Sequence, residues 1–442
     1  MKRNEAKAVK IDFAPKFLAA LLFLGIPGVD FASAAELHVG PGQPFQKIED
    51  AVAKAAPGDT ILVHPQPQNQ PYEKVALLIR QSNLTIRAVS DASGPVCLDG
   101  AGFDYSGNGP VPRAIVQFDP AAQGCTLDGF ALTGAHNKSF NGAGVRINQA
   151  NDILITHCEI HDNDMGIMSN GKLLASPPSG DHQRIEDCHI YHNGAVGDPG
   201  FNHNLYLGGT SVTLLRCEVN SSITGHNVKS RAHLTRVIDC YIHDSAAREF
   251  DLVDEVGNTD QPGSDALLLG NVIVKAKNNT ENRTVVHFGQ DGGHDRNGTL
   301  YLVHNTIVTP FLSPVIDLSA PHVRARLSAN LIWDGGSGQK NQVLVKNRTG
   351  STADGLVTGH DNFFCGGFGS QGALGLSVSG SEPPSFVTPD HGDYHLAKAD
   401  PRLCGQATGI KTVGIPEELS SGLGLGGDRP DNPDLGAYPF KQ

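Results

Sequence analysis

The sequence predicts an all-β protein in which short parallel strands wind into a right-handed β-helix. The first observation is a phrase that recurs about once every thirty residues, in which apolar residues lead into Cys or Asn and then into another aliphatic residue. The second is that each phrase is short, β-rich and punctuated by Gly, Asn and Asp, which is typical of strands joined by turns. The phrases are centred on Cys158, Cys188, Cys217, Cys240, Asn271, Asn305 and Asn330.

Stacking explains why the same position keeps returning. One coil cannot bury its own apolar side, whereas coils stacked about 4.8 Å apart turn each inward side chain into part of a ladder. The four repeat cysteines are therefore interpreted as small buried ladder residues rather than as disulfide partners. If the protein has a disulfide, we expect it among the cysteines outside this series, which are Cys97, Cys125, Cys365 and Cys404.

The first 34 residues have the features of a secretory signal peptide. Basic residues precede an apolar run from Phe17 to Leu24, and a small-residue cleavage site follows near Ala34. The apolar run is shorter than the roughly 20 residues that a membrane span needs. We therefore expect the mature chain, residues 35–442, to be secreted or periplasmic, and to be a monomer.

The charge of the chain narrows the classes of partner. The formal net charge is -12 at pH 7, and residues 1–34 are themselves basic, so the mature chain is more acidic still. Nucleic-acid binding and anionic-membrane binding both depend on broad positive surfaces, which this composition opposes. We therefore expect neither a nucleic acid nor a membrane as a partner.

Three regions follow the signal peptide. Residues 35–65 are predicted to form an N-terminal cap of a strand and an amphipathic helix, residues 66–370 the β-helix, and residues 371–442 a Gly-, Ser- and Pro-rich C-terminal tail and cap. A cap is needed because the terminal coil of a solenoid presents unpaired backbone and an exposed core. The apolar residues at helical spacing are Phe45, Ile48, Ala51, Val52 and Ala55.

A second strand follows each phrase, and these strands can be aligned with one another. Alternation along a β-strand points one set of side chains inward and the next set outward. The predicted inward residues are Ile167, Leu205, Val228, Phe250, Val286 and Ile316. The predicted outward column consists of Arg146, Met168, Tyr206, Lys229, Asp251, His287 and Asp317.

Further residues, all polar except Val285, are predicted beside this column. They are Asn204, Asn227, Glu249 and Val285 in an adjacent outward column, Arg231 on the same face, and His203 and His226 at its edge. An exposed sheet has no structural need for acids, bases, imidazoles and a phenol together. The mixture suits an elimination at a uronic acid, in which a cation neutralises the carboxylate, a base removes the neighbouring proton and an acid assists the leaving oxygen. We therefore expect an acidic polysaccharide, lying along the face, as the substrate.

A family resemblance extends over nearly the whole mature chain. The turn at residues 57–61, the stretch from Leu84 to Gly100, and the closing segments at residues 393–396 and 433–438 resemble members of the pectate-lyase-like superfamily. The resemblance implies a secreted parallel β-helix. It does not fix the activity, because the superfamily contains lyases, hydrolases, esterases, epimerases and non-catalytic adhesins.

The segment from Gly225 to Arg231 resembles the Lys/Arg arrangement of polysaccharide lyases such as chondroitinase B and the related alginate lyases. The resemblance implies that Lys229 is the base, that Arg231 stabilises charge, and that Glu249 and Asp251 hold Ca²⁺. In those enzymes the Lys and the Arg usually lie on different coils, whereas here they lie on one. The predicted catalytic residues are Lys229, Arg231, Tyr206, His203 and His226, and the predicted substrate-binding residues are Arg146, Asn204, Asn227, His287 and Asp317.

A polysaccharide lyase is the function that the sequence favours, and three alternatives stay open. Opposite charges on neighbouring strands are an ordinary way to stabilise an exposed sheet, each pair contributing less than about 1 kcal/mol. A glycoside hydrolase on the same fold would need paired carboxylates, for which Asp251, Asp254 and Asp317 are the candidates. A non-catalytic polysaccharide-binding or adhesin solenoid would use the same side chains as sugar contacts.

Overall fold

The computed structural model describes residues 34–89, 95–107, 111–171, 180–197, 201–279, 281–351, 355–368, 374, 382–408, 413–421 and 434–440. The predicted signal peptide, apart from Ala34, lies outside the described residues, and so do parts of the predicted tail. The described residues all belong to one compact unit, Ala34–Gln442. Among them, no helix is both long and apolar enough to cross a membrane.

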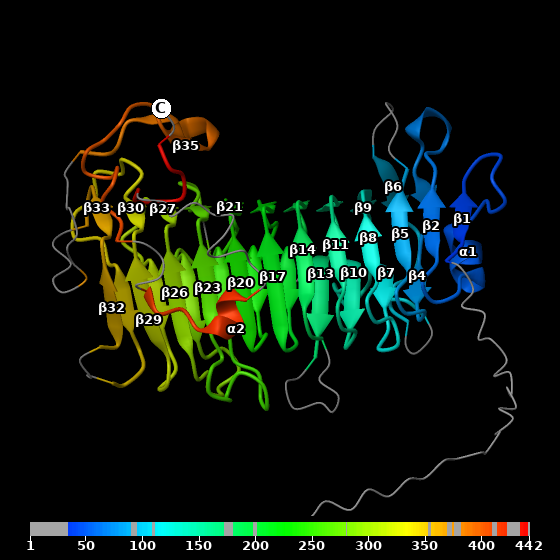
Figure 1. Ribbon diagram of the computed structural model, residues 1–442, viewed down its shortest axis with the longest axis horizontal. Coiled ribbons are helices and arrows are strands. Elements are labelled where there is room, and N and C mark those ends of the chain that lie inside the picture. Colours follow the sequence, from blue (N-terminus) through cyan, green and yellow to red (C-terminus); the bar gives the residue numbers. More distant parts are fainter. Residues whose placement is uncertain are drawn as a thin grey trace, which may run out of the picture. The chain divides into compact units, whose positions relative to one another are not determined.

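Three long sheets form the body of this unit (Figure 1). A complete coil contributes one strand to each sheet in turn, and every neighbouring pair within the three sheets is parallel. The chain returns to the same sheet about one coil later, as the repeat of the Cys and Asn phrases requires. The predicted fold, a right-handed parallel β-helix, is confirmed.

The strands are assigned to sheets A, B and C in chain order. Sheet A contains β1 (Glu36–Val39), β2 (Thr60–Val63), β5 (Thr85–Ala88), β8 (Thr126–Asp128), β11 (Leu154–Thr156), β14 (Gln183–Glu186), β17 (Ser211–Leu215), β20 (Leu234–Ile238), β23 (Ala266–Leu269), β26 (Thr299–Val303), β29 (Arg324–Ser328) and β32 (Val357–His360). Sheet B contains β3 (Tyr72–Glu73), β6 (Val96–Asp99), β9 (Phe130–Thr133), β12 (Glu159–His161), β15 (His189–Tyr191), β18 (Glu218–Asn220), β21 (Tyr241–His243), β24 (Val272–Val274), β27 (Thr306–Val308), β30 (Leu331–Trp333) and β33 (Phe363–Cys365). Sheet C contains β4 (Leu77–Ile79), β7 (Ala114–Phe118), β10 (Ala143–Asn148), β13 (Met165–Asn170), β16 (Leu205–Leu207), β19 (Val228–Ser230), β22 (Phe250–Val253), β25 (Val286–Gly289), β28 (Ile316–Leu318) and β31 (Val345–Asn347).

The turn from sheet A to sheet B repeats with one residue in the left-handed backbone region. His157, Asp187, Arg216, Asp239 and His304 adopt φ of 50°, 52°, 52°, 52° and 51° there. Each such residue costs on the order of 1 kcal/mol. The turn persists because the residue after it is the Cys or Asn of the repeat phrase, which stacks on its counterparts in the neighbouring coils.

These Cys and Asn side chains form one continuous buried ladder, as predicted. The backbone N–H of Cys158 donates to Sγ of Cys188 at 3.4 Å, and that of Cys240 donates to Oδ1 of Asn271 at 2.9 Å. From there the side-chain amide of Asn271 donates to Oδ1 of Asn305 at 3.0 Å. All eight cysteines are free thiols. No disulfide therefore forms among Cys97, Cys125, Cys365 and Cys404.

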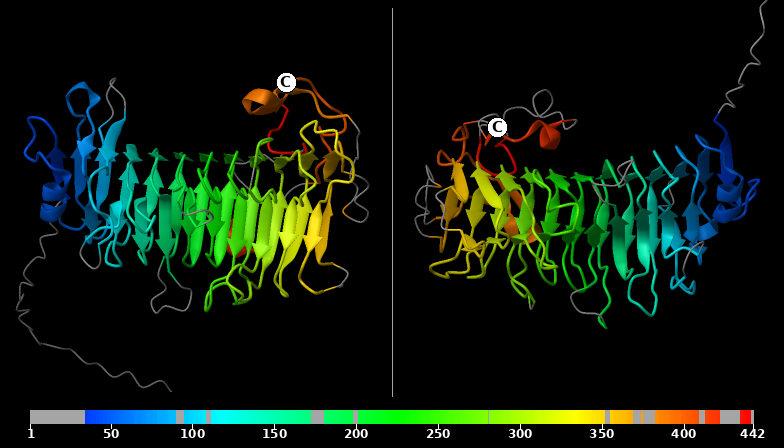
Figure 2. Two further views of the ribbon diagram at one scale, coloured as in Figure 1. Left: turned by 180° about the vertical axis from the view of Figure 1, so that it is seen from behind. Right: turned by 90° about the horizontal axis from the view of Figure 1, so that it is seen from below.

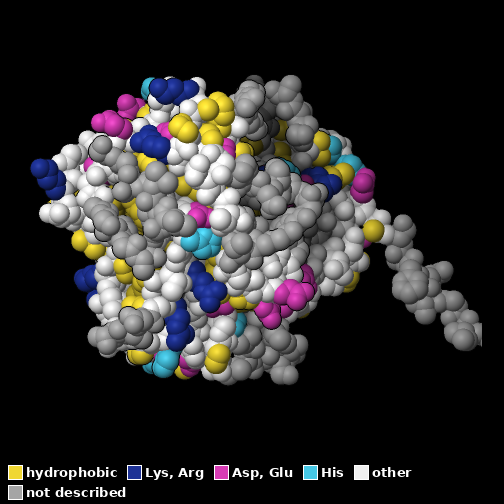
Figure 3. Space-filling view, turned by 60° about the vertical axis from the view of Figure 1, so that its left-hand side comes forward, with side chains coloured by type: hydrophobic (Ala, Val, Ile, Leu, Met, Phe, Trp, Pro, Cys, Tyr) yellow, Lys and Arg dark blue, Asp and Glu magenta, His cyan; other side chains and the backbone are white. Residues whose placement is uncertain are grey.

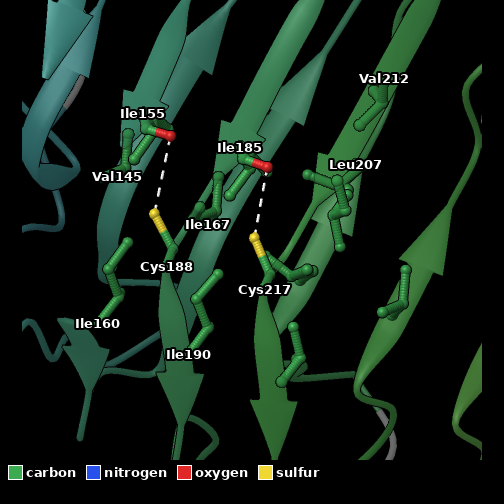
Figure 4. Close-up of a cluster of buried hydrophobic side chains, with 14 of the residues drawn as sticks. Val145, Ile155, Ile160, Ile167, Ile185, Cys188, Ile190, Leu207, Val212 and Cys217 are labelled. Atoms are coloured by element: carbon green, nitrogen blue, oxygen red, sulfur yellow. Dashed lines mark hydrogen bonds between the residues drawn. The ribbon is translucent and has the colours of Figure 1, made fainter. Parts of the chain in front are cut away.

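The core fills the space enclosed by the three sheets. Ile185 of sheet A, Ile190 of sheet B and Ile167 of sheet C are all at most 1% exposed and point into it (Figure 4). The ladder thiol of Cys217 lies among them, 3.3 Å from the carbonyl oxygen of Ile185. Each such aliphatic side chain contributes about 1.5–3 kcal/mol when fully buried.

The N-terminal segment contains a helix between two strands and is continuous with the solenoid. Helix α1 (Ile48–Lys54) buries Ile48, Ala51 and Val52 against the first coils. The strands on either side of it, β1 and β2, are already paired in sheet A. A short 3₁₀ turn, η1 (Pro67–Asn69), follows.

The described parts of the C-terminal tail pack on two of the sheets. An antiparallel pair, β34 (Phe386–Thr388) and β35 (Asp393–Leu396), flanks the 3₁₀ turn η3 (Pro389–His391) and places Tyr394 against Val308 of sheet B. Helix α2 (Glu417–Ser420) places Leu419 against Leu267 of sheet A. Figure 2 shows these segments toward the end of the solenoid opposite to α1. The tail thus contains more regular structure than predicted.

The surface carries charges of both signs. On the face drawn in Figure 3, basic, acidic and histidine side chains are dispersed rather than gathered into a broad patch of one sign.

Candidate functional site

The register of sheet C places the predicted outward column on a single face. Tyr206 pairs with Lys229, Lys229 with Asp251, and Asp251 with His287 on successive strands. The same register extends from Arg146 through Met168 on one side and to Asp317 on the other. The predicted alignment of the strands is therefore confirmed, and the predicted inward residues are all 0% exposed: Ile167, Leu205, Val228, Phe250, Val286 and Ile316.

Asp251 is the centre of this column. Its carboxylate is fully buried and lies 3.3 Å from Nε2 of His226, 3.2 Å from Nζ of Lys229, 2.9 Å from Nη1 of Arg248 and 2.8 Å from Nδ1 of His287. Burial by itself would raise the pKa of Asp251, but His226, His287 and Lys229 hold it well below the ordinary value. Asp251 is therefore a permanent anion that organises the side chains around it.

Lys229 lies between two carboxylates. Its Nζ is 3.2 Å from Oδ2 of Asp251 and 2.7 Å from Oδ2 of Asp291, and its side chain is only 8% exposed. Both carboxylates form ion pairs with the ammonium group of Lys229. In this arrangement Lys229 can donate a proton but has no free lone pair with which to accept one.

Tyr206 and Arg231 form a direct pair. Nε of Arg231 donates to the hydroxyl oxygen of Tyr206 at 2.8 Å, and Nη2 donates to Oδ2 of Asp291 at 2.8 Å. Nη1 donates to the backbone oxygen of Asp254. The guanidinium carbon of Arg231 and Nζ of Lys229 each lie 5.9 Å from the centre of the Tyr206 ring. Two cations thus flank one phenol.

Asp291 is a site residue that the sequence did not predict. It lies in the loop after β25, outside the repeat phrases. The buried carboxylate of Asp254 accepts hydrogen bonds from the backbone N–H groups of Asp291, Gly292 and His294 at 2.5, 2.8 and 2.7 Å. These bonds fold the loop back over the column. The signal in the sequence is the pair Gly292 and Gly293, which marks a tight loop directly after Asp291.

His203 and His226 stack at the start of their strands, with ring centroids 4.9 Å apart, and His203 also stacks on Tyr206 at 5.7 Å. Nδ1 of His203 accepts from the backbone of His226 at 3.0 Å, and Nδ1 of His226 accepts from the backbone of Arg248 at 3.1 Å. Each ring therefore carries its proton on Nε2. Burial lowers the pKa of both imidazoles, that of His203 well below its ordinary value, so both are neutral.

No protein-family model matches the sequence, and no curated protein does. Among solved structures, the chain is similar to pectate lyase Pel9A, with 13% identity, a TM-score of 0.51, and 92% of this chain and 97% of that chain covered. This likeness shows the fold, a parallel β-helix. An alginate lyase from Paenibacillus sp. str. FPU-7 is 14% identical, with a TM-score of 0.48, covering 71% of this chain and 98% of that chain. A rhamnogalacturonan lyase is 13% identical, with a TM-score of 0.49, covering 92% and 96%.

One predicted column of the β-helix was wrong. Asn204, Asn227, Glu249 and Val285 were expected to face outward, but all four are 0% exposed. They precede the first residues of their strands, at the corner between sheets B and C, where the bend of the chain interrupts the alternation. Nδ2 of Asn204 donates to Oδ1 of Asn227 at 2.8 Å, and Nδ2 of Asn227 donates to Oε2 of Glu249 at 2.6 Å. Asn204 and Asn227 therefore form a buried ladder and are not positioned to bind substrate.

Glu249 and Asp251 do not fit a shared calcium site. Glu249 lies inside the corner, where Oε1 accepts from the hydroxyl of Ser245 at 2.9 Å and pairs with the buried ammonium of Lys275 at 3.4 Å. Asp251 lies on the outer column and is surrounded by basic and imidazole groups. Ca²⁺ requires several oxygen ligands that converge on one point. In the described part of the chain, no group of three or more His, Cys, Asp or Glu side chains converges in this way.

Two predicted substrate-binding residues lie in the column with their polar atoms already engaged. His287 contacts Asp251 through Nδ1 at 2.8 Å and the hydroxyl of Ser319 through Nε2 at 2.7 Å. Asp317 accepts from Nε and Nη2 of Arg348 at 2.8 and 2.9 Å. Both residues extend the polar network along the face, and their binding role stays a prediction.

Arg146 lies two coils before Tyr206 and is 7% exposed. Nη2 donates to the backbone oxygen of Asn141 at 3.3 Å, whereas Nε is buried without a hydrogen-bond partner. Burial, with a smaller contribution from Arg113, lowers the pKa of Arg146 to about 10, so the guanidinium remains charged at neutral pH. Its role in binding substrate stays a prediction.

Proposed function

We propose that the protein is an exported polysaccharide lyase that cleaves a uronic-acid-containing polymer by β-elimination. The observation that carries the proposal is the contact between Nε of Arg231 and the hydroxyl oxygen of Tyr206 at 2.8 Å. A guanidinium can only donate, so the phenol oxygen must accept. This contact places a cation at the oxygen that would carry the negative charge when Tyr206 acts as the base that removes the proton next to the uronate carboxylate.

Lys229 supplies the complementary acid. The phenolate of Tyr206 takes the proton from C5 of the sugar, the electrons of that bond form the C4–C5 double bond, and the bond from C4 to the glycosidic oxygen breaks. The ammonium of Lys229 gives a proton to the departing oxygen. This division of roles differs from the one implied by the family resemblance, in which Lys229 was the base, because Nζ of Lys229 is paired with Asp251 and Asp291 while the oxygen of Tyr206 accepts from Arg231.

The remaining residues hold these two groups in place. Asp251 pairs with Lys229 and is itself held by His226 and His287. Asp291 pairs with the charged groups of both Lys229 and Arg231. Arg231 and Lys229 together place positive charge beside Tyr206. That charge supports binding of a uronate and stabilises the negative charge that develops when its proton is removed.

The hydrolase alternative receives less support from the same geometry. A glycosidase needs one carboxylate to protonate the leaving oxygen and another to act on water or on the sugar. Asp251 is enclosed by four side chains, Asp254 accepts three backbone N–H groups, and Asp317 is held by both donors of Arg348. None of these carboxylates is free for that chemistry. The fold itself is compatible with elimination, since pectate lyase Pel9A shares it.

The test is incubation of the full-length protein with pectate, alginate and glycosaminoglycans. A lyase produces the conjugated unsaturated uronate, which absorbs in the ultraviolet, with every new reducing end. A hydrolase would produce reducing ends without that absorbance, and a binder would produce neither. The proposal fails if new reducing ends appear without the ultraviolet signal on any of these polymers, or if none of the polymers is cut.

A further inference from the structure

A cavity of about 730 Å³ lies away from the column, between sheet B and the C-terminal segment. Its floor includes Tyr241 of β21, Val308 of β27 and Trp333 of β30, and its cover includes Asp390 of η3 and Tyr394 of β35. The labels β21, β27, β30 and β35 mark the elements in Figure 1. The volume falls within the range of about 300–1,000 Å³ that is usual for small-ligand sites.

The buried side chains at the corner between sheets B and C separate this cavity from the outward column of sheet C. Lys275 lines the cavity and donates to Glu249, and Glu249 accepts from Asn227 on its other side. Lys229, two residues after Asn227, faces the opposite surface of the coil. A ligand in the cavity therefore does not contact the residues proposed to carry out the elimination.

One wall of the cavity presents a buried acceptor without a partner. The side chain of Asn279 is 5% exposed, and its Nδ2 donates to the backbone oxygens of Ser245 and Ala246 at 2.8 and 2.7 Å. These carbonyls fix which end of the amide is nitrogen. The opposite atom, Oδ1, is buried and has no hydrogen-bond partner. An unpaired buried acceptor is unfavourable, and a hydrogen bond from a ligand hydroxyl would satisfy it.

The cover presents a hydroxyl group on a mostly buried side chain. Tyr394 is 6% exposed, and its hydroxyl makes no hydrogen bond with any described residue. Burial, and the nearby carboxylates of Asp244 and Asp390, raise the pKa of Tyr394 to about 12, so the hydroxyl keeps its proton at neutral pH. The cavity therefore offers an unused donor, an unused acceptor and two carboxylates that can accept from hydroxyl groups.

The aromatic part of the wall suits a ring with an apolar face. Trp333 is half-buried, with its indole packed on Phe386 at 5.5 Å, and the ring of Tyr241 lies on the same floor. Flat aromatic surfaces next to fixed donors and acceptors match a pyranose, which has C–H groups on its faces and hydroxyl groups around its rim. Asp244 and Asp390 are balanced in the lining by Lys275 and Lys277, and Lys275 is already paired with Glu249, so the cavity has no excess positive charge to attract a uronate.

From these features we infer that the cavity between sheet B and the C-terminal segment is a non-catalytic binding site for one neutral sugar unit. The site is independent of the proposed elimination. It would hold a neutral residue of a polysaccharide, or a neutral side branch, while the column acts elsewhere on the polymer.

Trp333 makes a direct test available, because it is the only tryptophan in the chain. Intrinsic fluorescence of the full-length protein is titrated with glucose, galactose, mannose and rhamnose, and with galacturonate and glucuronate as anionic counterparts. We expect a saturable change with at least one neutral sugar and a weaker response to the uronates. The inference is overturned if none of the neutral sugars changes the fluorescence, or if the uronates saturate at lower concentration.

A pair of variants identifies the site. Tyr394→Phe removes a hydroxyl that has no protein partner, so it should leave the fold intact and weaken sugar binding about three- to ten-fold. Tyr191→Phe is the matched control, because Tyr191 lies on sheet B outside the cavity with its hydroxyl on Glu159 at 2.5 Å. Its titration should equal that of the wild type. Equal affinity of Tyr394→Phe and the wild type would overturn the inference, and neither result depends on whether the protein is a lyase.

Discussion

Two runs of polar residues lie along the same strands of sheet C. They differ in the groups to which their side chains form hydrogen bonds. The corner ladder comprises Asn163, Asn193, Asn204, Asn227 and Glu249, which are 0% exposed and joined side chain to side chain. The middle of the outward column consists of Tyr206, Lys229, Asp251 and His287, and the loop residue Asp291 contacts Lys229 there. Asn227 and Lys229 are only two residues apart. Polar residue type alone therefore does not distinguish a structural run from a functional one.

The difference lies in how the hydrogen-bonding groups are used. In the corner ladder each amide donates to the next coil and to a backbone carbonyl, as Nδ2 of Asn227 does to His243 at 2.7 Å. Nothing in that run remains for a ligand, and its loss should appear as lost stability. In the column, Tyr206 has an oxygen that only one donor contacts and a ring that is partly exposed. Its loss should appear as lost activity.

The largest expected effect is on catalysis in the column. Tyr206→Phe keeps the ring and removes the proposed base, and Lys229→Met keeps the stem and removes the proposed acid. Each should reduce the rate of ultraviolet product formation by about 100-fold or more. Thermal unfolding of Tyr206→Phe should match that of the wild type, since its hydroxyl has only the one contact with Arg231. Full activity in Tyr206→Phe would show that the base is another group.

The next largest effect is on stability in the corner ladder. Glu249→Gln leaves the buried ammonium of Lys275 without its counter-charge, which should reduce the free energy of unfolding by about 3–5 kcal/mol. Glu218→Gln is the control, because that carboxylate is 45% exposed and should matter little. Denaturant unfolding measures both variants. Equal free energies of unfolding for the two variants would show that the buried carboxylate of Glu249 stabilises the fold no more than the exposed carboxylate of Glu218 does.

A smaller effect is expected from one rung of the ladder. Asn227→Ala removes the donor to Glu249 and the acceptor for Asn204, which should cost about 1–3 kcal/mol. Asn170→Ala, at an exposed strand end, is the matched change and should cost much less. A larger loss of stability in Asn170→Ala than in Asn227→Ala would reverse the assignment of the two runs.

The smallest effect is a pH dependence of stability, which arises from His203 and His226 at the edge of the column. Burial keeps His203 and His226 neutral in the folded protein, whereas an unfolded histidine titrates near about 6.5. Below that pH the unfolded chain binds protons that the folded chain does not, so the free energy of unfolding should fall as the pH drops through it. His203→Asn keeps an acceptor for the backbone of His226 but does not titrate. An unchanged pH slope in this variant would contradict the assignment.

Most of the fold could be predicted from the sequence, because each coil of a solenoid repeats the same pattern of residues. The Cys and Asn phrases fixed the register, and alternation then placed Tyr206, Lys229 and Asp251 in one column. The corner was missed because alternation holds only within a strand, and Asn204 and Asn227 stand just before one. Asp291 was missed because it lies in a loop of no fixed length, and only the carboxylate of Asp254 brings it to Lys229.

The central claim is that Tyr206 and Lys229 perform an elimination, and the masses of the products test it most directly. Mass spectrometry of oligosaccharides released from pectate, alginate or a glycosaminoglycan distinguishes an unsaturated end from a saturated one by the mass of one water. We predict products that are lighter by one water and that are absent when Tyr206→Phe replaces the wild type. Saturated products from the wild-type protein would contradict the account.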